Sequence, residues 1–360
     1  MDPILLELYT DYLIASFGPT TATGMARLTD QAISHDQVTR LLASPRKTGR
    51  DLWRKVKPLV RKIQSPEGVL IVDDTIEEKP YTDENEIVCW HFDPSKGRNV
   101  KGINFLTALY ENQGQSLPVS FDIVEKTEVC TDEKTGKLKR RSATTKNERF
   151  RQMLTQCVHN RLEFGYVLAD SWFASSENMR HVKLALECDF IFALKANRKV
   201  ALSAADKQQG HYVRVDALVI EPLAVREVYL KEVPFPLLFC KEIFTNEDGT
   251  SGVLYLITSD TTLTSGHMKT YYTRRWKVEE YHKSVKQNAS LAKSPTRTET
   301  TQTNHLFASL LAFVKLEGLK ATTSKNHYAL KTKLYVKALK SAFAELQRLK
   351  QGSFALQPAA

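Results

Sequence analysis

The sequence predicts an α/β protein: a mixed β-sheet with flanking helices, a late block of inserted strands and a helical N-terminal region. Continuous apolar runs at 68–75 (GVLIVDDT), 165–175 (GYVLADSWFAS) and 189–198 (DFIFALKANR) are typical of buried strands. Amphipathic helical segments lie between the later runs, at 148–164 and 177–187. Strands that alternate with helices predict a sheet covered by helices.

Residues 1–66 are expected to form an N-terminal helical DNA-binding domain. Ser34 precedes Gln37 by three residues, which is a capping-box pattern for a helix start. Two short helices, the second carrying Gln37, Thr39 and Arg40, fit either a helix-turn-helix or a small packed bundle. The basic segment 51–63 favours contact with DNA.

Four further regions follow. Residues 67–200 and 263–320 are expected to form two parts of one core of strands and helices. Residues 201–262 read as a β-strand insertion with a turn at 246–249, and residues 321–360 as a basic helical tail. Within the core, 100–126 predicts a hairpin, and the polar segment 127–148 predicts a loop, either solvated or in contact with DNA.

Composition restricts the class of protein. The 360 residues are 42% hydrophobic with a net charge of +10, which fits a globular protein with anionic partners such as nucleic acid. Five cysteines without a C-x-x-C pair argue against a disulfide scaffold or structural zinc site. No run reaches the ~18 apolar residues of a membrane span, and the N-terminus is acidic where a signal peptide is basic. We expect a soluble cytoplasmic protein.

Three acidic residues are candidates for a metal-binding site. Asp73 and Asp170 each end a predicted strand, and Glu279 lies on a predicted helix at 271–287. Three carboxylates that converge without a cationic neighbour repel one another unless a divalent metal holds them, and oxygen ligands favour Mg²⁺ or Mn²⁺. Asp74 and Glu280 are the alternatives. Asp73 is preferred because it shares its strand phase with the apolar residues before it.

The helix at 271–287 has two faces. At about 100° per residue, Tyr272, Arg275, Glu279 and Lys286 fall within about 60° of arc. Val278, Tyr281 and Val285 share another arc that can pack on a core. Of the neighbouring aromatic and imidazole side chains, we expect Trp172 and Phe173 in the core and His282 in solvent or facing DNA.

The spacing Y-x2-R-x3-E-x6-K, met by Tyr272, Arg275, Glu279 and Lys286, resembles the signature of bacterial insertion-sequence transposases of the DDE class. The segments IVDDT (71–75), ADSWFAS (169–175) and FIFALKANR (190–198) strengthen this resemblance, which covers about 68–320. It implies an RNase H-like catalytic core with a β-strand insertion before the glutamate helix.

The resemblance also implies roles for these residues. Asp73, Asp170 and Glu279 would be the catalytic metal-binding triad for two Mg²⁺ ions, with Mn²⁺ as a substitute. Tyr272, Arg275 and Lys286 would bind DNA phosphates, and Lys283 lies on the same face. The protein would be a DNA transposase acting as a homodimer in the bacterial cytoplasm, at the nucleoid. It would cut double-stranded DNA at terminal inverted repeats and join 3′ ends to target DNA.

Two rival functions share these features. An RNase H-like metal-dependent nuclease would cut without strand transfer. A domesticated DNA-binding protein would carry the same site in an idle state, but an unused site has no reason to keep its carboxylates crowded together.

Overall fold

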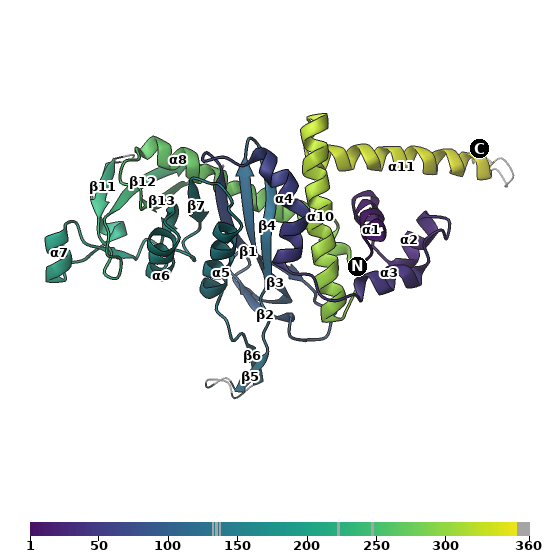
Figure 1. Cartoon of the computed structure of the whole chain (residues 1–360), viewed down its shortest axis with the longest axis horizontal. Coiled ribbons are helices and arrows are strands. Elements are labelled where there is room, and N and C mark those ends of the chain that lie inside the picture. The colour runs from purple at the N-terminus through teal and green to yellow at the C-terminus, as the bar shows by residue number, and fades with distance from the viewer. Residues whose placement is uncertain (132, 134–135, 137, 222–223, 246–247, 351–360) are drawn as a thin grey trace, which may run out of the picture. The chain divides into compact units, whose positions relative to one another are not determined.

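The fold is described from a computed structural model, which covers residues 1–131, 133, 136, 138–221, 224–245 and 248–350 (Figure 1). The chain forms two compact units, one from residues 46–282 and one from residues 1–45 and 283–360. The helices are α1 (Pro3–Ala15), α2 (Ala22–Leu28), α3 (His35–Leu42), α4 (Gly49–Ile63), α5 (Lys146–His159), α6 (Ser176–Arg180), α7 (Ala204–Gln209), α8 (Ser265–Thr273), α9 (Lys277–Gln287), α10 (Glu299–Thr323) and α11 (His327–Lys350). The strands are β1 (Val69–Glu78), β2 (Val88–Asp93), β3 (Arg98–Asn112), β4 (Gln115–Ile123), β5 (Glu128–Thr131), β6 (Leu138–Arg141), β7 (Tyr166–Ala169), β8 (Asp189–Leu194), β9 (Lys199–Val200), β10 (Val213–Arg214), β11 (Val225–Val228), β12 (Leu237–Thr245) and β13 (Ser251–Thr258).

A nine-stranded mixed sheet forms the centre of the unit 46–282. Its order is β11-β12-β13-β8-β7-β1-β3-β2, and β4 pairs with β3 as well. β3 is antiparallel to both β1 and β4, whereas β7 is parallel to both β1 and β8. This mixed sheet flanked by helices confirms the predicted fold class, and its order β4-β3-β1-β7-β8 fits an RNase H-like core.

The predicted hairpin at 100–126 is present as β3 and β4. Gln113 and Gly114 connect the strands, and both have positive φ values, of 52° and 75°. Two consecutive residues in this conformation form the turn whose twist matches paired strands, and glycine adopts it without steric cost.

The two faces of the sheet are covered by different helices. Residues directly opposite each other in antiparallel strands point to the same face. Asp73 lies opposite Thr107, and the Thr107 hydroxyl lies 3.2 Å from the Tyr281 hydroxyl of α9. On the other face, Arg149 of α5 forms an ion pair with Asp122 of β4 at 2.7 Å. The face that carries Asp73 is therefore the face that α9 covers.

The strands of the predicted insertion extend the main sheet. β13 pairs antiparallel with β8, and β12 and β11 follow outward. The segment 211–221, predicted as a strand, contributes only β10 and a 3-10 turn, Val215–Ala217. Of the turn predicted at 246–249, residues 246 and 247 lie outside the described residues.

The loop predicted at 127–148 contains regular structure. β5 and β6 pair as a small hairpin that projects from the sheet in Figure 1, and α5 begins at Lys146. The polar composition hid these strands, because a two-stranded ribbon with both faces in solvent has no apolar alternation. Residues 132, 134–135 and 137 of this segment lie outside the description.

The unit of residues 1–45 and 283–360 is helical. The capping box predicted at Ser34 is confirmed, because its hydroxyl accepts from the Gln37 N–H and the Gln37 side chain accepts from the Ser34 N–H. Asn304 of α10 donates to the carbonyls of Leu42 and Ser44, at 2.8 and 2.7 Å. These two hydrogen bonds hold the chain segment after α3 against α10.

The unit boundary differs from the predicted domain boundary at residue 66. The division falls after Pro45, so α4 belongs to the unit that contains the sheet. Its apolar stripe is buried there, with Leu52, Val56 and Val60 at 0% exposure. The basic residues of α4 that suggested DNA binding therefore occupy the outer side of a helix of the core unit. The predicted tail follows as α11 up to Lys350, and 351–360 lie outside the description.

None of the helices in the described ranges has the length and apolarity needed to cross a membrane.

Candidate active site

Asp73 lies at the point where the sheet opens between β1 and β7. The parallel pairing of the two strands ends at Ile71 and Leu168. β1 itself continues to Glu78 beside β3, so Asp73 is inside the strand and not at its end as predicted. Because its neighbour β7 stops at Ala169, the Asp73 carboxylate has no strand beside it on that side.

Asp170 is the first residue after β7, as predicted. Its Oδ1 atom accepts hydrogen bonds from the backbone N–H groups of Trp172 at 2.9 Å and Phe173 at 3.4 Å. These bonds turn the chain back after the strand and hold the carboxylate in place. Its negative charge acts on Asp73 and raises the pKa of that carboxyl.

Glu279 reaches the same place from α9. Ligand atoms of Asp73, Glu279 and His282 all lie within 4.8 Å of one another. The apolar arc predicted for this helix is confirmed, because Val278, Tyr281 and Val285 are buried at 0–1% exposure. Burial of this stripe fixes the rotation of α9 and directs Glu279 toward Asp73.

His282 was wrongly predicted to face solvent or DNA. It is 6% exposed, and its ring packs edge-on against Phe105 of β3 at a centroid distance of 6.3 Å. It follows Glu279 by three residues, which places both on one side of a helix. That spacing is the signal in the sequence that could have identified it.

The segment predicted as one helix at 271–287 is broken. α8 ends at Thr273, a 3-10 turn covers Arg274–Trp276, and α9 begins at Lys277. Across this turn Tyr272, Arg275 and Glu279 still lie together as predicted, because the Arg275 guanidinium is 5.8 Å from the Tyr272 ring centroid and its Nη1 atom is 3.5 Å from Glu279 Oε1. Tyr272 is 6% exposed, and its hydroxyl lies 3.4 Å from the Ala169 carbonyl oxygen.

Arg275 is the cation of this site. Its Nη1 atom lies 3.6 Å from Asp73 Oδ2 and 3.5 Å from Glu279 Oε1. Its guanidinium also lies over the rings of Tyr272 and Trp276, at 5.8 and 5.2 Å from their centroids. The carboxylates therefore have a cationic neighbour, and it is the arginine predicted on the arc of Glu279.

The charges at the site shift the pKa values of its members. Burial, and then the charges of Asp170 and Asp74, raise the pKa of Asp73 well above its ordinary value of 3.8, although Arg275 opposes this. Burial likewise raises the pKa of Asp170. Burial would lower the pKa of Arg275, but the tyrosine and carboxylates around it outweigh burial and raise it. The single positive charge of Arg275 therefore does not balance the carboxylates, and the site keeps an excess of negative charge.

Asp74 has a different environment from Asp73. Its Oδ2 atom accepts from Lys146 Nζ at 2.6 Å and from Asn104 Nδ2 at 2.8 Å. Lys146 belongs to α5, on the face of the sheet opposite α9. Asp74 is therefore bound in an ion pair, whereas Asp73 faces Glu279.

Lys283 and Lys286 follow Glu279 on α9 and belong to the helical unit. The Lys283 ammonium lies 5.5 Å from the ring centroid of Tyr328, and Lys286 is half-buried. Glu280, the alternative to Glu279, pairs with Lys277 at 2.9 Å in an exposed position. Of the two core residues predicted after Asp170, Phe173 is fully buried, but Trp172 is 54% exposed.

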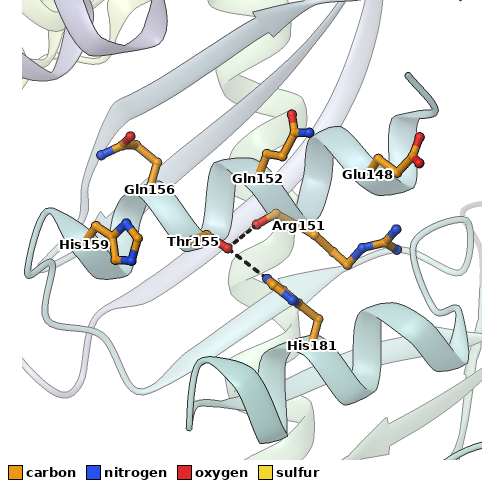
Figure 2. A pocket seen from close by; sticks show the side chains of 7 residues that line it. All are labelled: Glu148, Arg151, Gln152, Thr155, Gln156, His159 and His181. Atoms are coloured by element: carbon orange, nitrogen blue, oxygen red, sulfur yellow. Dashed lines mark hydrogen bonds between the residues drawn. The ribbon is translucent and has the colours of Figure 1, made fainter. Parts of the chain in front are cut away.

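A pocket between α5 and the segment around His181 contains none of these residues. It is lined by Glu148, Arg151, Gln152, Thr155, Gln156, His159 and His181 (Figure 2). Figure 2 shows His181 directed at Thr155, whose hydroxyl lies 2.9 Å from its Nε2 atom and donates to the Arg151 carbonyl. Among the described residues its lining offers a single carboxylate, that of Glu148, whereas several acids lie together around Asp73, so the acids around Asp73 remain the better candidate site.

The donor set around Asp73 fits a divalent cation. It offers carboxylate oxygens from Asp73 and Glu279 and an imidazole nitrogen from His282 within 4.8 Å. Asp170 is not part of this close cluster, although its charge acts on Asp73. Oxygen ligands of this kind suit Mg²⁺ or Mn²⁺, and a nitrogen ligand favours transition metals over Mg²⁺. A cation would also relieve the repulsion that raises the pKa of Asp73.

The mixed sheet with acidic residues at its centre agrees with what a comparison with protein families finds. Residues 5–214 match the family described as DDE superfamily endonuclease, and the chain belongs to this family. The matched range includes Asp73 and Asp170 and ends before Glu279. Enzymes of this superfamily use divalent metals.

Among solved structures, a Drosophila P element transposase strand transfer complex is similar over 94% of this chain and 85% of that chain, at 8% sequence identity and a TM-score of 0.29. A likeness at this TM-score does not bear on the assignment. No curated protein matches the chain.

Proposed function

We propose that the protein is the DNA transposase of a bacterial insertion sequence. It binds the terminal inverted repeats of its element, cuts there and joins the 3′ ends to target DNA. The observation that carries the proposal is the convergence of Asp73 and Glu279, with Asp170 close enough to raise the pKa of Asp73. Membership of the DDE endonuclease family supports the reaction class.

Asp73, Asp170 and Glu279 hold the metal in this proposal, as two Mg²⁺ ions or Mn²⁺ in their place. Bound divalent ions supply Lewis-acid activation of a phosphate and of the hydroxyl that attacks it. The burial of Asp73 matters for this role, because a carboxylate screened from water binds a cation more strongly.

Arg275 positions the scissile phosphate. Its side chain is only 12% exposed, and its buried Nε–H has no hydrogen-bond partner among the described residues. Because Arg275 also lies 3.5–3.6 Å from two of the acids, a phosphate that it binds is held beside them. Planar guanidinium groups bind phosphate oxygens in pairs, which fixes orientation as well as position.

Three other residues contact DNA in this proposal. Lys283 and Lys286 of α9 bind phosphates of the transposon end. Tyr272 is buried, so its ring supports Arg275 from beneath, and its hydroxyl reaches a phosphate only if it leaves the Ala169 carbonyl. The helices of 1–45 hold the repeat, with α3 presenting exposed Gln37, Thr39 and Arg40.

The protein acts as a homodimer in the bacterial cytoplasm, because two ends must be processed together. An apolar stripe of α11 supports the dimer: Leu339, Phe343 and Leu346 are 48–65% exposed and follow each other at helical spacing.

The test uses purified protein, Mg²⁺ and a supercoiled plasmid that carries the gene with its native flanking DNA. Sequencing of every new end and junction is the readout. Cuts at the borders of a repeat-bounded segment, with junctions to new target sites, are expected. Cuts without junctions would favour a nuclease, and tight border binding without cuts would favour an idle DNA-binding protein.

A further inference from the structure

Trp172 exposes an indole ring beside the candidate site. It is 54% exposed, whereas the next residue, Phe173, is fully buried. Its backbone N–H donates to Asp170 Oδ1 at 2.9 Å. The backbone of Trp172 is therefore hydrogen-bonded to one of the proposed metal-binding carboxylates, which lies two residues before it in the chain.

Basic side chains surround this ring. The ammonium groups of Lys146 and Lys195 lie 5.9 and 5.3 Å from its ring centroid. These distances are near the ~6 Å limit of a cation–π contact. Lys146 is already paired with Asp74. No carboxylate in the described ranges pairs with Lys195, so its charge is available to an anionic ligand.

The ring forms part of the wall of a basic cleft. A cleft of about 360 Å³ is lined by Trp172, Lys195, Asn197, Arg198 and Lys199, and none of the described residues that line it is acidic. A second cleft of about 550 Å³ shares Arg198 and Lys199 and adds Lys231 and Tyr212, with Glu232 as its one acid among the described residues. The two clefts meet at Arg198 and Lys199, and four cationic residues among those described line them together: Lys195, Arg198, Lys199 and Lys231.

An exposed aromatic ring in a positively charged cleft is the arrangement that binds single-stranded nucleic acid. The phosphates lie along the cations, and a base stacks on the ring. A base in a duplex cannot do this, since its faces are covered by its neighbours. The chemistry of the cleft therefore selects a nucleotide whose base is unpaired.

We propose that Trp172 stacks an unpaired base of the DNA strand next to the scissile phosphate. Lys195, Arg198 and Lys199 bind the phosphates that follow it. In the absence of DNA, the Lys195 ammonium lies over the indole ring. When DNA binds, the base stacks on this ring and the Lys195 ammonium pairs with a phosphate. This inference rests on the proposed function and names the form of its substrate.

The test compares two strands that differ only in their bases: a fluorescein-labelled decamer of thymidylate and a decamer of abasic nucleotides. Fluorescence anisotropy measures their affinity for the full chain. Stacking of one base is worth a factor of about 5 to 150 in affinity. Trp172→Ala should lose a factor of that order for the thymidylate strand and leave the abasic strand unchanged, and Trp172→Phe should lose less.

Trp90 provides the matched control. It is 54% exposed like Trp172, but it lies on β2 and lines neither cleft. Trp90→Ala should bind both strands as the wild type does. Lys195→Ala should weaken both strands equally and reduce the slope of log K against log salt by about 0.7, the value for one phosphate of a single strand.

Equal effects of Trp172→Ala on the two strands, or no effect on either, would overturn the stacking proposal. If the wild type binds duplex DNA from the element borders but does not distinguish the two strands, only this inference falls. If it binds no DNA of any kind, the proposed function falls with it.

Discussion

The guanidinium of Arg275 lies 3.6 Å from the carboxylate of Asp73. Both side chains are nearly buried, at 12% and 14% exposure. This pair joins the 3-10 turn between α8 and α9 to the middle of β1. In a protein without bound metal, Arg275 is the positive charge that offsets the carboxylates, so it has a part in stability as well as in the proposed contact with phosphate.

Arg275→Met should destabilise the metal-free protein. It leaves Asp73 and Glu279 with no cation at a largely buried site, and breaking such a pair costs about 3 kcal/mol. Thermal unfolding at pH 7.5 in EDTA measures the loss, and Mn²⁺ should restore more stability to the variant than to the wild type. Lys277→Met is the control, since it breaks an exposed pair worth about 0–1 kcal/mol. Equal effects of the two substitutions would contradict a special role for Arg275.

Asp73→Asn should stabilise the metal-free protein while it removes activity. The pKa of Asp73 is raised in the folded state, mainly by burial and by Asp170. The stability from this group is full below pH 3.8 and is lost as the pH rises through the raised pKa. The advantage of the variant in free energy of unfolding should therefore grow with pH through that window. We expect at least about 1 kcal/mol, since one pKa unit is worth about 1.4 kcal/mol.

Unfolding curves of both proteins in EDTA from pH 4 to 8 provide the measurement for Asp73→Asn. Glu280→Gln, at an exposed position on α9, is the control and should show a flat difference from the wild type. If the variant is less stable than the wild type across this pH range, burial and the neighbouring acids do not destabilise the ionised carboxylate of Asp73.

Asp74→Asn should act in the opposite way to Asp73→Asn. Asp74 is paired with Lys146 at 2.6 Å and accepts from Asn104, so the substitution breaks an ion pair. We expect a loss of about 1–3 kcal/mol in stability and DNA cleavage that persists below the new unfolding temperature. Cleavage assays of the two variants side by side at 20 °C distinguish them. Complete loss of cleavage in Asp74→Asn alone would make Asp74 the first metal ligand.

Lys286→Ala should weaken binding of the transposon end and flatten its dependence on salt. One lost phosphate contact lowers the slope of log K against log salt by about 0.9 on duplex DNA. Titrations at four salt concentrations between 50 and 200 mM give this slope. Lys337→Ala, on the exposed helix α11, tests whether any lysine has the same effect. An unchanged slope in Lys286→Ala would exclude a phosphate contact at that position.

The sequence predicted the sheet and its acids because each depends on a local pattern. The strand at β1 was visible as an unbroken apolar run, and the stripe of Val278, Tyr281 and Val285 on α9 had helical spacing. The end of β1 was misjudged because acids at Asp73 and Asp74 mimic the end of a strand. Pairing with β3 carries the strand on to Glu78.

The break between α8 and α9 could not be predicted in the same way. The residues Arg274–Trp276 have no glycine or proline, and their propensities suit a helix. Two long-range ion pairs are made from this turn: Arg274 pairs with Glu111 of β3, and Arg275 reaches Asp73. Such long-range ion pairs leave no periodic signal in the sequence, so the break was not predicted, although Tyr272, Arg275 and Glu279 still lie together across it.

The central claim is that Glu279 holds metal for DNA cleavage and does not bind DNA itself. The most direct measurement compares the wild type with Glu279→Gln on one labelled DNA fragment from the element border, with binding measured in Ca²⁺ and cleavage in Mg²⁺. The account predicts that cleavage is abolished and that border binding changes by less than about threefold, a difference under 1 kcal/mol. Equal loss of binding and cleavage, or cleavage that survives, would contradict it.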